Sequence, residues 1–222
     1  MRVEHDVGKA AFLDGLRTLR VAVDDLDDQQ LLAPSRCRGW SAVDLLVHVH
    51  LGLQEMLLGV VTPAAGAPDT DAAGYWRTLP PPTGADGVSH VRFVRLMASA
   101  YRVPTSAVGH LRETAEALAH AAGSLPEGVV AFQGHALTTG DFFATWAVEL
   151  AVHHLDLGAE LVLPPPAPAA LTLARDTVEA LAGATSPWDD LTTVLVGTGR
   201  QRPDERQAAE AAALADRLPV LG

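Results

Sequence analysis

The sequence is poor in cysteine and lysine, with one of each among 222 residues. The single cysteine, Cys37, excludes an intramolecular disulfide and a cluster of thiolate metal ligands. A secretory signal needs a basic start followed by an apolar run, and residues 1–9 instead carry Glu4, His5 and Asp6. Both features predict a protein of the reducing cytoplasm.

Positive charge and long apolar runs are also scarce. The net charge is −11 and the isoelectric point about 5.1, which argues against a protein that neutralises nucleic-acid phosphates or anionic lipid. The apolar stretch 45–53 is interrupted by His48 and His50 and is shorter than the ~20 residues that span a bilayer. We therefore expect neither a nucleic-acid partner nor a membrane span. With 48% hydrophobic and 19% charged residues, the composition is that of a folded globular protein.

Apolar residues recur with helical spacing along most of the chain. Between residues 7 and 32 they are spaced alternately by four and three, which predicts a first helix. Ser41 and Asp44 have the spacing of a capping box and predict a second helix over 42–60. Pro, Gly, Ala and Asp dominate residues 62–87, which predicts a long loop.

The second half of the chain shows two further long helical patterns, over 105–122 and 142–157. A short helix is expected over 88–102 and a brief strand over 128–132. After a proline-rich linker at 164–168, the remaining predictions are a helix over 169–182, a strand over 191–196 and a helix over 203–218. The fold class is therefore mainly α, with a small α/β segment at the C-terminal end.

Glu149 and His153 are the first candidates for a functional site. Residues four apart on a helix share a face, so both side chains could bind one ion, whereas His154 is rotated away by roughly a further 100°. An exposed helix-stabilising pair is the alternative, and the spacing alone does not decide between them. The apolar neighbours of the pair favour burial, and a buried carboxylate requires a partner.

A third ligand is expected from the second predicted helix. His48 and His50 point about 200° apart there, so at most one of them can enter the same site, and His48 has the small Gly52 one turn away. A site of two imidazoles, one carboxylate and an open position suits Zn²⁺ or another divalent first-row metal. A core histidine without a metal remains the alternative for His48.

Two segments resemble the motifs of one family, the mycothiol-dependent maleylpyruvate isomerase and DinB-like metalloenzymes. Residues 39–48 are similar to its Gly-Trp-x-x-x-Asp-Leu-Leu-x-His motif, and residues 149–157 to its Glu-x-x-x-His-x-x-Asp-Leu motif. The resemblance implies that His48, Glu149 and His153 are metal ligands. The tail, with Gly197-Thr-Gly-Arg200, also resembles the C-terminal extension of this group.

The resemblance implies an antiparallel four-helix bundle of the DinB type over residues 1–163 and the extension over 164–222. It further implies zinc or another divalent metal, mycothiol as thiol cosubstrate, a small electrophilic substrate, and a monomer or homodimer. The fifteen arginines against one lysine fit the actinobacteria in which the family abounds.

The sequence departs from the isomerase at two positions. The isomerase has arginines three and one residues before the ligand Glu, where Trp146 and Val148 stand here. Arg92 is the substitute candidate for gripping a substrate carboxylate, with a solvated helix charge as the alternative. We expect a metal- and thiol-dependent transferase or isomerase; a non-catalytic metal-binding bundle and a metal-dependent hydrolase are the competing hypotheses.

Overall fold

The computed structural model describes residues 1–79, 84–211, 214 and 217–221. Over these residues the chain is mainly helical, with one small antiparallel sheet. The elements are α1 (His5–Val23), η1 (Gln30–Leu32), α2 (Ala42–Val60), α3 (Ala72–Thr78), α4 (Gly84–Ser99), α5 (Pro104–Ser124), β1 (Val129–Phe132), β2 (His135–Thr138), α6 (Thr139–Leu157), α7 (Pro168–Ala182), α8 (Asp190–Gly197) and α9 (Glu205–Glu210).

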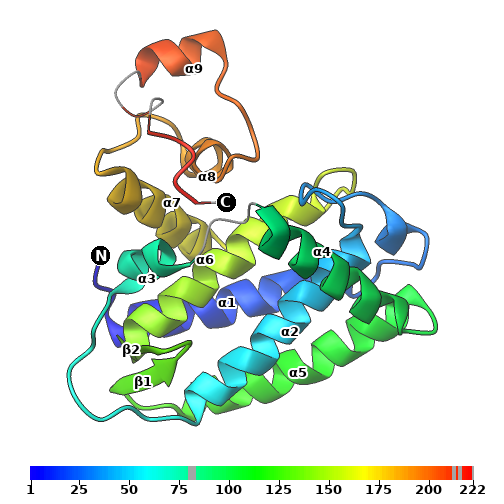
Figure 1. The fold of residues 1–222 in the computed structure, drawn as a ribbon, viewed down its shortest axis with the longest axis horizontal. Helices are drawn as coiled ribbons and strands as arrows, with labels where there is room; N and C mark the ends of the chain where they lie inside the picture. Colours follow the sequence, from blue (N-terminus) through cyan, green and yellow to red (C-terminus); the bar gives the residue numbers. More distant parts are fainter. Residues whose placement is uncertain (80–83, 212–213, 215–216, 222) are drawn as a thin grey trace.

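Four long helices, α1, α2, α5 and α6, form the expected bundle (Figure 1). Helix α1 packs along α6 and α2 along α5, while contacts of α1 with α5 and of α2 with α6 close the core. The predicted apolar face of α1 is buried at Phe12, Leu16 and Leu19. Helix α6 is buried on nearly every side, as expected for the central helix of a core.

Two caps set where the helices that carry the candidate ligands begin. Before α2, the backbone nitrogen and the hydroxyl of Ser41 both donate to Asp44 Oδ2, at 2.8 and 2.7 Å. Before α6, Thr138 Oγ1 accepts from the Asp141 nitrogen at 3.1 Å. Because a helix turns by about 100° per residue, the starting residue helps to set which side chains face the core.

Helix α2 is long and apolar enough to cross a membrane by length and composition. However, 56% of its apolar window is buried inside the structure, and a core helix of a folded domain passes the same test. The apolar character of α2 is therefore explained by its place in the bundle.

The expected loop over 62–87 contains more structure than its composition indicates. It forms α3, whose N-cap Asp71 accepts from the Gly74 nitrogen at 2.7 Å, and it includes the first turn of α4. Residues 80–83 lie outside the described residues. The first helix is shorter than predicted, because α1 ends at Val23 and an aspartate-rich turn separates it from η1.

The strand predicted over 191–196 is wrong, because this segment forms the helix α8. Asp189 caps it by accepting from the Thr192 nitrogen at 2.7 Å, and Gly197 lets its backbone approach Val178 of α7. Packing and capping here override the strand preference of β-branched residues. The described part of the extension is therefore helical rather than α/β, and the sheet of the chain is the β1–β2 hairpin.

The extension has a small core of its own, formed by Ala182, Trp188, Val196, Ala211 and Leu214. The helix predicted over 203–218 is shorter in the structure, where α9 ends at Glu210; part of the remainder lies outside the described residues. Helix α7 joins this extension to the bundle by packing on α6.

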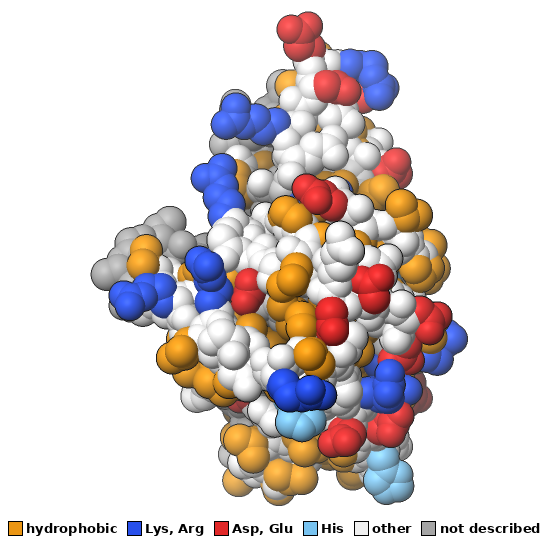
Figure 2. Space-filling view, turned by 90° about the vertical axis from the view of Figure 1, so that its right-hand side faces the viewer, with side chains coloured by type: hydrophobic (Ala, Val, Ile, Leu, Met, Phe, Trp, Pro, Cys, Tyr) orange, Lys and Arg blue, Asp and Glu red, His pale blue; other side chains and the backbone are white. Residues whose placement is uncertain are grey.

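Figure 2 shows one side of the molecule, on which acidic and basic side chains are interspersed. The described part of this side therefore lacks the uniformly basic surface that binds a phosphate backbone.

Candidate metal centre

His48 from α2 meets Glu149 and His153 from α6. Glu149 Oε1 lies 3.1 Å from His153 Nε2 and 3.4 Å from His48 Nε2. The centroids of the two imidazole rings are 5.0 Å apart. One ligand atom from each residue lies within 4.8 Å of the other two. The fold thus brings together the three side chains that the sequence analysis selected.

The three side chains are only partly shielded from solvent. His48 and Glu149 keep 23% and 24% of their side-chain surface exposed, and His153 keeps 8%. A small molecule can therefore approach the group from the side of His48 and Glu149, while His153 is held in the core.

The charges of the group are mutually stabilising. Burial acts to raise the pKa of Glu149, but His153 and His48 outweigh it and hold that pKa well below its usual range. Burial acts to lower the pKa of His153, but the Glu149 charge and a hydrogen bond to Asp156 raise it well above its usual value. The directions of these two pKa shifts indicate a site that favours positive charge, which a bound cation could supply.

Asp156 orients His153 from behind. Its Oδ2 lies 3.0 Å from His153 Nδ1 and also accepts from the Cys37 thiol at 3.2 Å. Burial acts to raise the pKa of Asp156, whereas its hydrogen bonds to His153 and Arg200 hold it well below its usual range. Because Asp156 lies at Nδ1, the other ring nitrogen, Nε2, is the one that faces Glu149 and His48.

Arg200 comes from the C-terminal extension and donates two hydrogen bonds to Asp156. Its Nε donates to Oδ1 and its Nη2 to Oδ2, both at 3.0 Å. Asp156 is fully buried, so the paired guanidinium is what makes its charge tolerable there. The extension, remote in sequence, therefore completes the surroundings of His153. The sequence analysis assigned no role to Arg200 and did not predict where Asp156 points, although Asp156 is spaced one turn from His153.

Two neighbouring histidines point away from the group. His154 Nε2 lies 2.7 Å from the Pro164 carbonyl oxygen, and His50 Nε2 lies 2.9 Å from Thr114 Oγ1. Burial lowers the pKa of both imidazoles. Helix geometry predicts this division, because His153 shares a face with Glu149 and His154 does not.

His90 is a neighbour that the sequence analysis did not single out. It lies on α4, and the centroid of its ring is 5.3 Å from the ring centroid of His48 and 5.6 Å from that of Trp40. The Trp40 ring in turn lies 5.1 Å from His48, and its nitrogen donates to the Val91 carbonyl oxygen at 3.3 Å. No spacing rule links His90 to the other residues, because only the packing of α4 on α2 brings it there.

A hydrogen-bonded chain of three side chains lies close enough to Glu149 for its charge to act on Tyr75. The Tyr75 hydroxyl donates to Gln133 Oε1 at 2.5 Å, and Gln133 Nε2 donates to Glu55 Oε2 at 2.9 Å. Burial and the charges of Glu149 and Glu55 raise the pKa of Tyr75, which keeps its hydroxyl protonated.

The small Gly52, one turn from His48, packs against Trp146. A Cβ atom at Gly52 would lie 2.6 Å from the Trp146 ring, so this glycine admits an aromatic side chain rather than a ligand. Trp146 and Val148, which replace the arginines of the isomerase, are both buried in the core.

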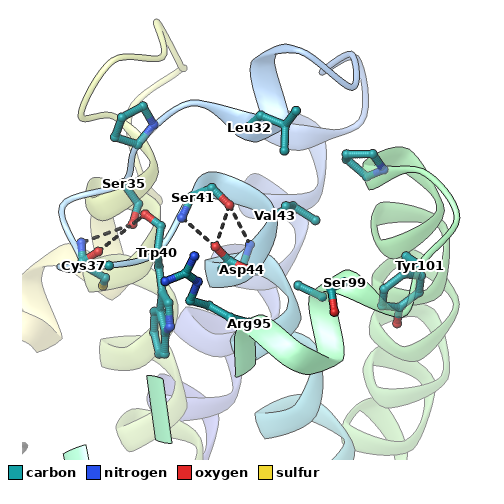
Figure 3. A pocket seen from close by; sticks show the side chains of 14 residues that line it. Leu32, Ser35, Cys37, Trp40, Ser41, Val43, Asp44, Arg95, Ser99 and Tyr101 are labelled. Carbon is teal, nitrogen blue, oxygen red and sulfur yellow. Dashed lines mark hydrogen bonds between the residues drawn. The ribbon is translucent and has the colours of Figure 1, made fainter. Parts of the chain in front are cut away.

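Arg92 lies on α4 with an exposed side chain, outside the residues that line the cavity at the start of α2. Arg95, one turn further along the same helix, lines that cavity and extends toward Trp40 and Asp44 (Figure 3). The assignment of Arg92 to substrate binding stays a prediction.

The donor set fits a divalent transition metal. Two imidazole nitrogens and one carboxylate oxygen converge, and the other nitrogen of His153 is already held by Asp156. Cys37, His153 and Asp156 form a second group of possible donors, but both oxygens of Asp156 are engaged by Arg200. The first group is the better candidate.

Comparison with known protein families gives one match. The mycothiol maleylpyruvate isomerase N-terminal domain matches residues 12–158, which include His48, Glu149 and His153. Neither the curated proteins nor the solved structures contain a match to this chain.

Proposed function

The chain belongs to the family of the mycothiol maleylpyruvate isomerase N-terminal domain, and on this premise we propose that it is a metal- and thiol-dependent enzyme. His48, Glu149 and His153 would hold one divalent ion, most simply Zn²⁺. The observation that carries the proposal is the convergence of their three ligand atoms to within 4.8 Å. A bound ion of this kind lowers the pKa of a coordinated thiol, so that a thiolate is present near neutral pH.

The residues of the chain have separate roles in this proposal. Glu149 supplies the negative charge of the ligand set, and His48 lies on its solvent-accessible side. Asp156 accepts a hydrogen bond from His153 Nδ1, which keeps the lone pair of Nε2 directed at the metal position. Arg200 holds Asp156 in its charged form. Trp40 and His90 form the wall beside His48.

Two reactions are open to a thiolate at this site. Addition to an electron-poor cis double bond forms a C–S bond and leaves a single bond that can rotate; elimination then breaks the C–S bond and returns the thiol and the trans alkene. Displacement of a leaving group instead gives a stable thioether, which is a transferase reaction. The buried Trp146 and Val148 supply no charge for a substrate anion, so we propose a small electrophile without fixing its class.

The test is an assay of zinc-loaded protein with mycothiol and a panel of cis-enoyl acids and alkylating electrophiles. Thiol-dependent isomerisation or thioether formation that disappears in Glu149→Gln supports the proposal. Inertness toward every thiol, together with metal-dependent hydrolysis of esters or amides, would favour a hydrolase. Inertness in both assays with full metal content would favour a metal-binding bundle without catalysis.

A further inference from the structure

His90 is a third imidazole beside the candidate metal centre. It lies in the first half of α4, and α4 packs mainly on α2, the helix that carries His48 (Figure 1). The ring centroids of His48 and His90 are 5.3 Å apart, and those of His48 and His153 are 5.0 Å apart. His48 therefore has one imidazole on α6 and another on α4 at nearly equal distances.

The two ring contacts of His48 also have the same geometry. Each neighbouring ring meets it edge to face, with interplanar angles of 84° for His90 and 86° for His153. The ligand atoms of His48, Glu149 and His153 converge to within 4.8 Å, and no nitrogen of His90 belongs to that group. Coordination by His90 therefore requires its side chain to turn toward Glu149.

No hydrogen bond within the described part of the chain holds the His90 ring in another direction. It differs in this from His50 and His154, whose rings are bonded elsewhere. Burial and the charge of His48 lower the pKa of His90, whereas the Glu149 charge acts to raise it. His90 is thus close enough to Glu149 for the charge of that carboxylate to act on it.

Trp40 holds the backbone of α4 next to His90. Its indole nitrogen donates to the Val91 carbonyl oxygen at 3.3 Å, and its ring centroid lies 5.6 Å from that of His90. Gly39, with a φ of +85°, also approaches this point, because a Cβ atom there would lie 3.4 Å from Val91 Cγ1. With the backbone already fixed, only the side-chain torsions of His90 need to be ordered, which lowers the entropic cost of binding a metal.

We propose that His90 is a fourth ligand of the metal, joining His48, Glu149 and His153 when no substrate or thiol is bound. This inference rests on the metal centre of the proposed function. Three imidazoles and one carboxylate complete the four-ligand set that is typical of zinc, so the resting metal has no position open to water. An incoming ligand must then displace one imidazole, and His90 is the one whose helix lies outside the four-helix bundle.

The test is X-ray absorption spectroscopy of the zinc-loaded full-length protein, which counts the imidazoles bound to the metal. We expect three imidazoles per zinc in the unmodified protein and two in His90→Ala. His120→Ala removes an exposed histidine of α5, is the matched control and should keep three. Addition of N-acetylcysteine should lower the count in the unmodified protein from three to two as one sulfur appears.

Zinc affinity gives a second readout that requires no turnover. Competition with a chromophoric chelator should show a loss of roughly tenfold or more in His90→Ala, because a bond to the metal is removed, and no loss in His120→Ala.

The same imidazole count and the same zinc affinity in the unmodified protein and in His90→Ala would overturn the role of His90 and leave the metal centre intact. Three imidazoles retained beside the sulfur of N-acetylcysteine would overturn the displacement of His90. Zinc content that is unchanged in both His48→Ala and Glu149→Gln would overturn the metal centre itself, and this inference with it.

Discussion

His48 and His50 stand two residues apart on α2 and enter two different environments. His48 points toward Glu149 and His153, whereas His50 lies among Thr114, Tyr101 and His110. The Tyr101 hydroxyl is 3.5 Å from His50 Nδ1 and 3.3 Å from His110 Nδ1. We call His48, Glu149 and His153 the first cluster, and His50, Thr114, Tyr101 and His110 the second cluster. Each cluster contains two imidazoles, but only the first contains a carboxylate.

The carboxylate decides what each cluster can hold. Glu149 raises the pKa of its partner His153, so the first cluster attracts positive charge. In the second cluster, burial and the nearby His110 lower the pKa of His50, so positive charge is disfavoured. The number of histidines is therefore a poorer sign of a cation site than a partly buried acid between them.

The largest expected effect is loss of metal from the first cluster alone. His48→Ala should lower zinc affinity by more than the ~100-fold that damage to an outer-shell partner causes, because a ligand itself is removed. His50→Ala is the matched control and should keep about one ion per chain. Elemental analysis after dialysis against zinc buffers measures both. One zinc ion per chain in His48→Ala would contradict the assignment of the metal to the first cluster.

The same contrast exists on α6 between His153 and His154. His153→Ala should abolish tight zinc binding and thiol-dependent activity, while His154→Ala should keep the metal and lose at most ~10–100-fold in affinity. His154 bonds the Pro164 carbonyl instead of the metal group. Metal stoichiometry in the two variants decides the matter; loss only in His154→Ala would mean that the ligand face of α6 is assigned wrongly.

A smaller effect is expected where the extension supports the first cluster. Arg200→Gln removes the paired charge from buried Asp156, so His153 loses part of its orientation and zinc affinity should fall by ~10–100-fold. Arg202→Gln, an exposed neighbour, should leave affinity unchanged. Competition with a chromophoric chelator gives both affinities. Partial recovery of zinc affinity in Arg200→Lys would show how much of the effect comes from the charge and how much from the two hydrogen bonds to Asp156. Identical zinc affinities for Arg200→Gln and Arg202→Gln would exclude a role of Arg200 in zinc binding.

The smallest expected effect is on the pH dependence of stability, through His50 of the second cluster. Because burial and His110 lower the folded-state pKa of His50, the unfolded chain binds its proton first as pH falls below about 6.5. The contribution of His50 to stability is therefore complete above that pH and decreases below it, with a slope no steeper than about 1.4 kcal/mol per pH unit for one proton. Urea unfolding of His50→Gln between pH 5 and 8 should show a flatter profile, with exposed His120→Gln as control. An unchanged slope in His50→Gln would show that His50 titrates alike in both states.

Much of the bundle could be predicted from local sequence. Ser41 and Asp44 mark the start of α2, and its predicted bounds agree with the structure. The alternating spacing of Phe12, Leu16 and Leu19 identifies the buried face of α1. These features depend on residues within one or two turns of each other, so the sequence contains them directly.

The strand predicted over 191–196 failed for a tertiary reason. Its β-branched residues favour a strand locally, but the segment packs as a helix on α7, and no local pattern reports the position of α7. The residues around the candidate site failed similarly. Arg200 lies 44 positions from Asp156, and Arg95 reaches its cavity only because α4 packs on α2.

By itself the sequence determined which side chains could share a helix face: Glu149 with His153, and His48 apart from His50. Helix geometry is regular, so spacing alone is sufficient for that. Only the tertiary structure decided that α2 and α6 bring these faces to within 4.8 Å, that Arg200 reaches Asp156 from the extension, and that Trp146 fills the space beside Gly52. Contacts between distant helices depend on how whole faces pack, and that information is not present in any single stretch of the chain.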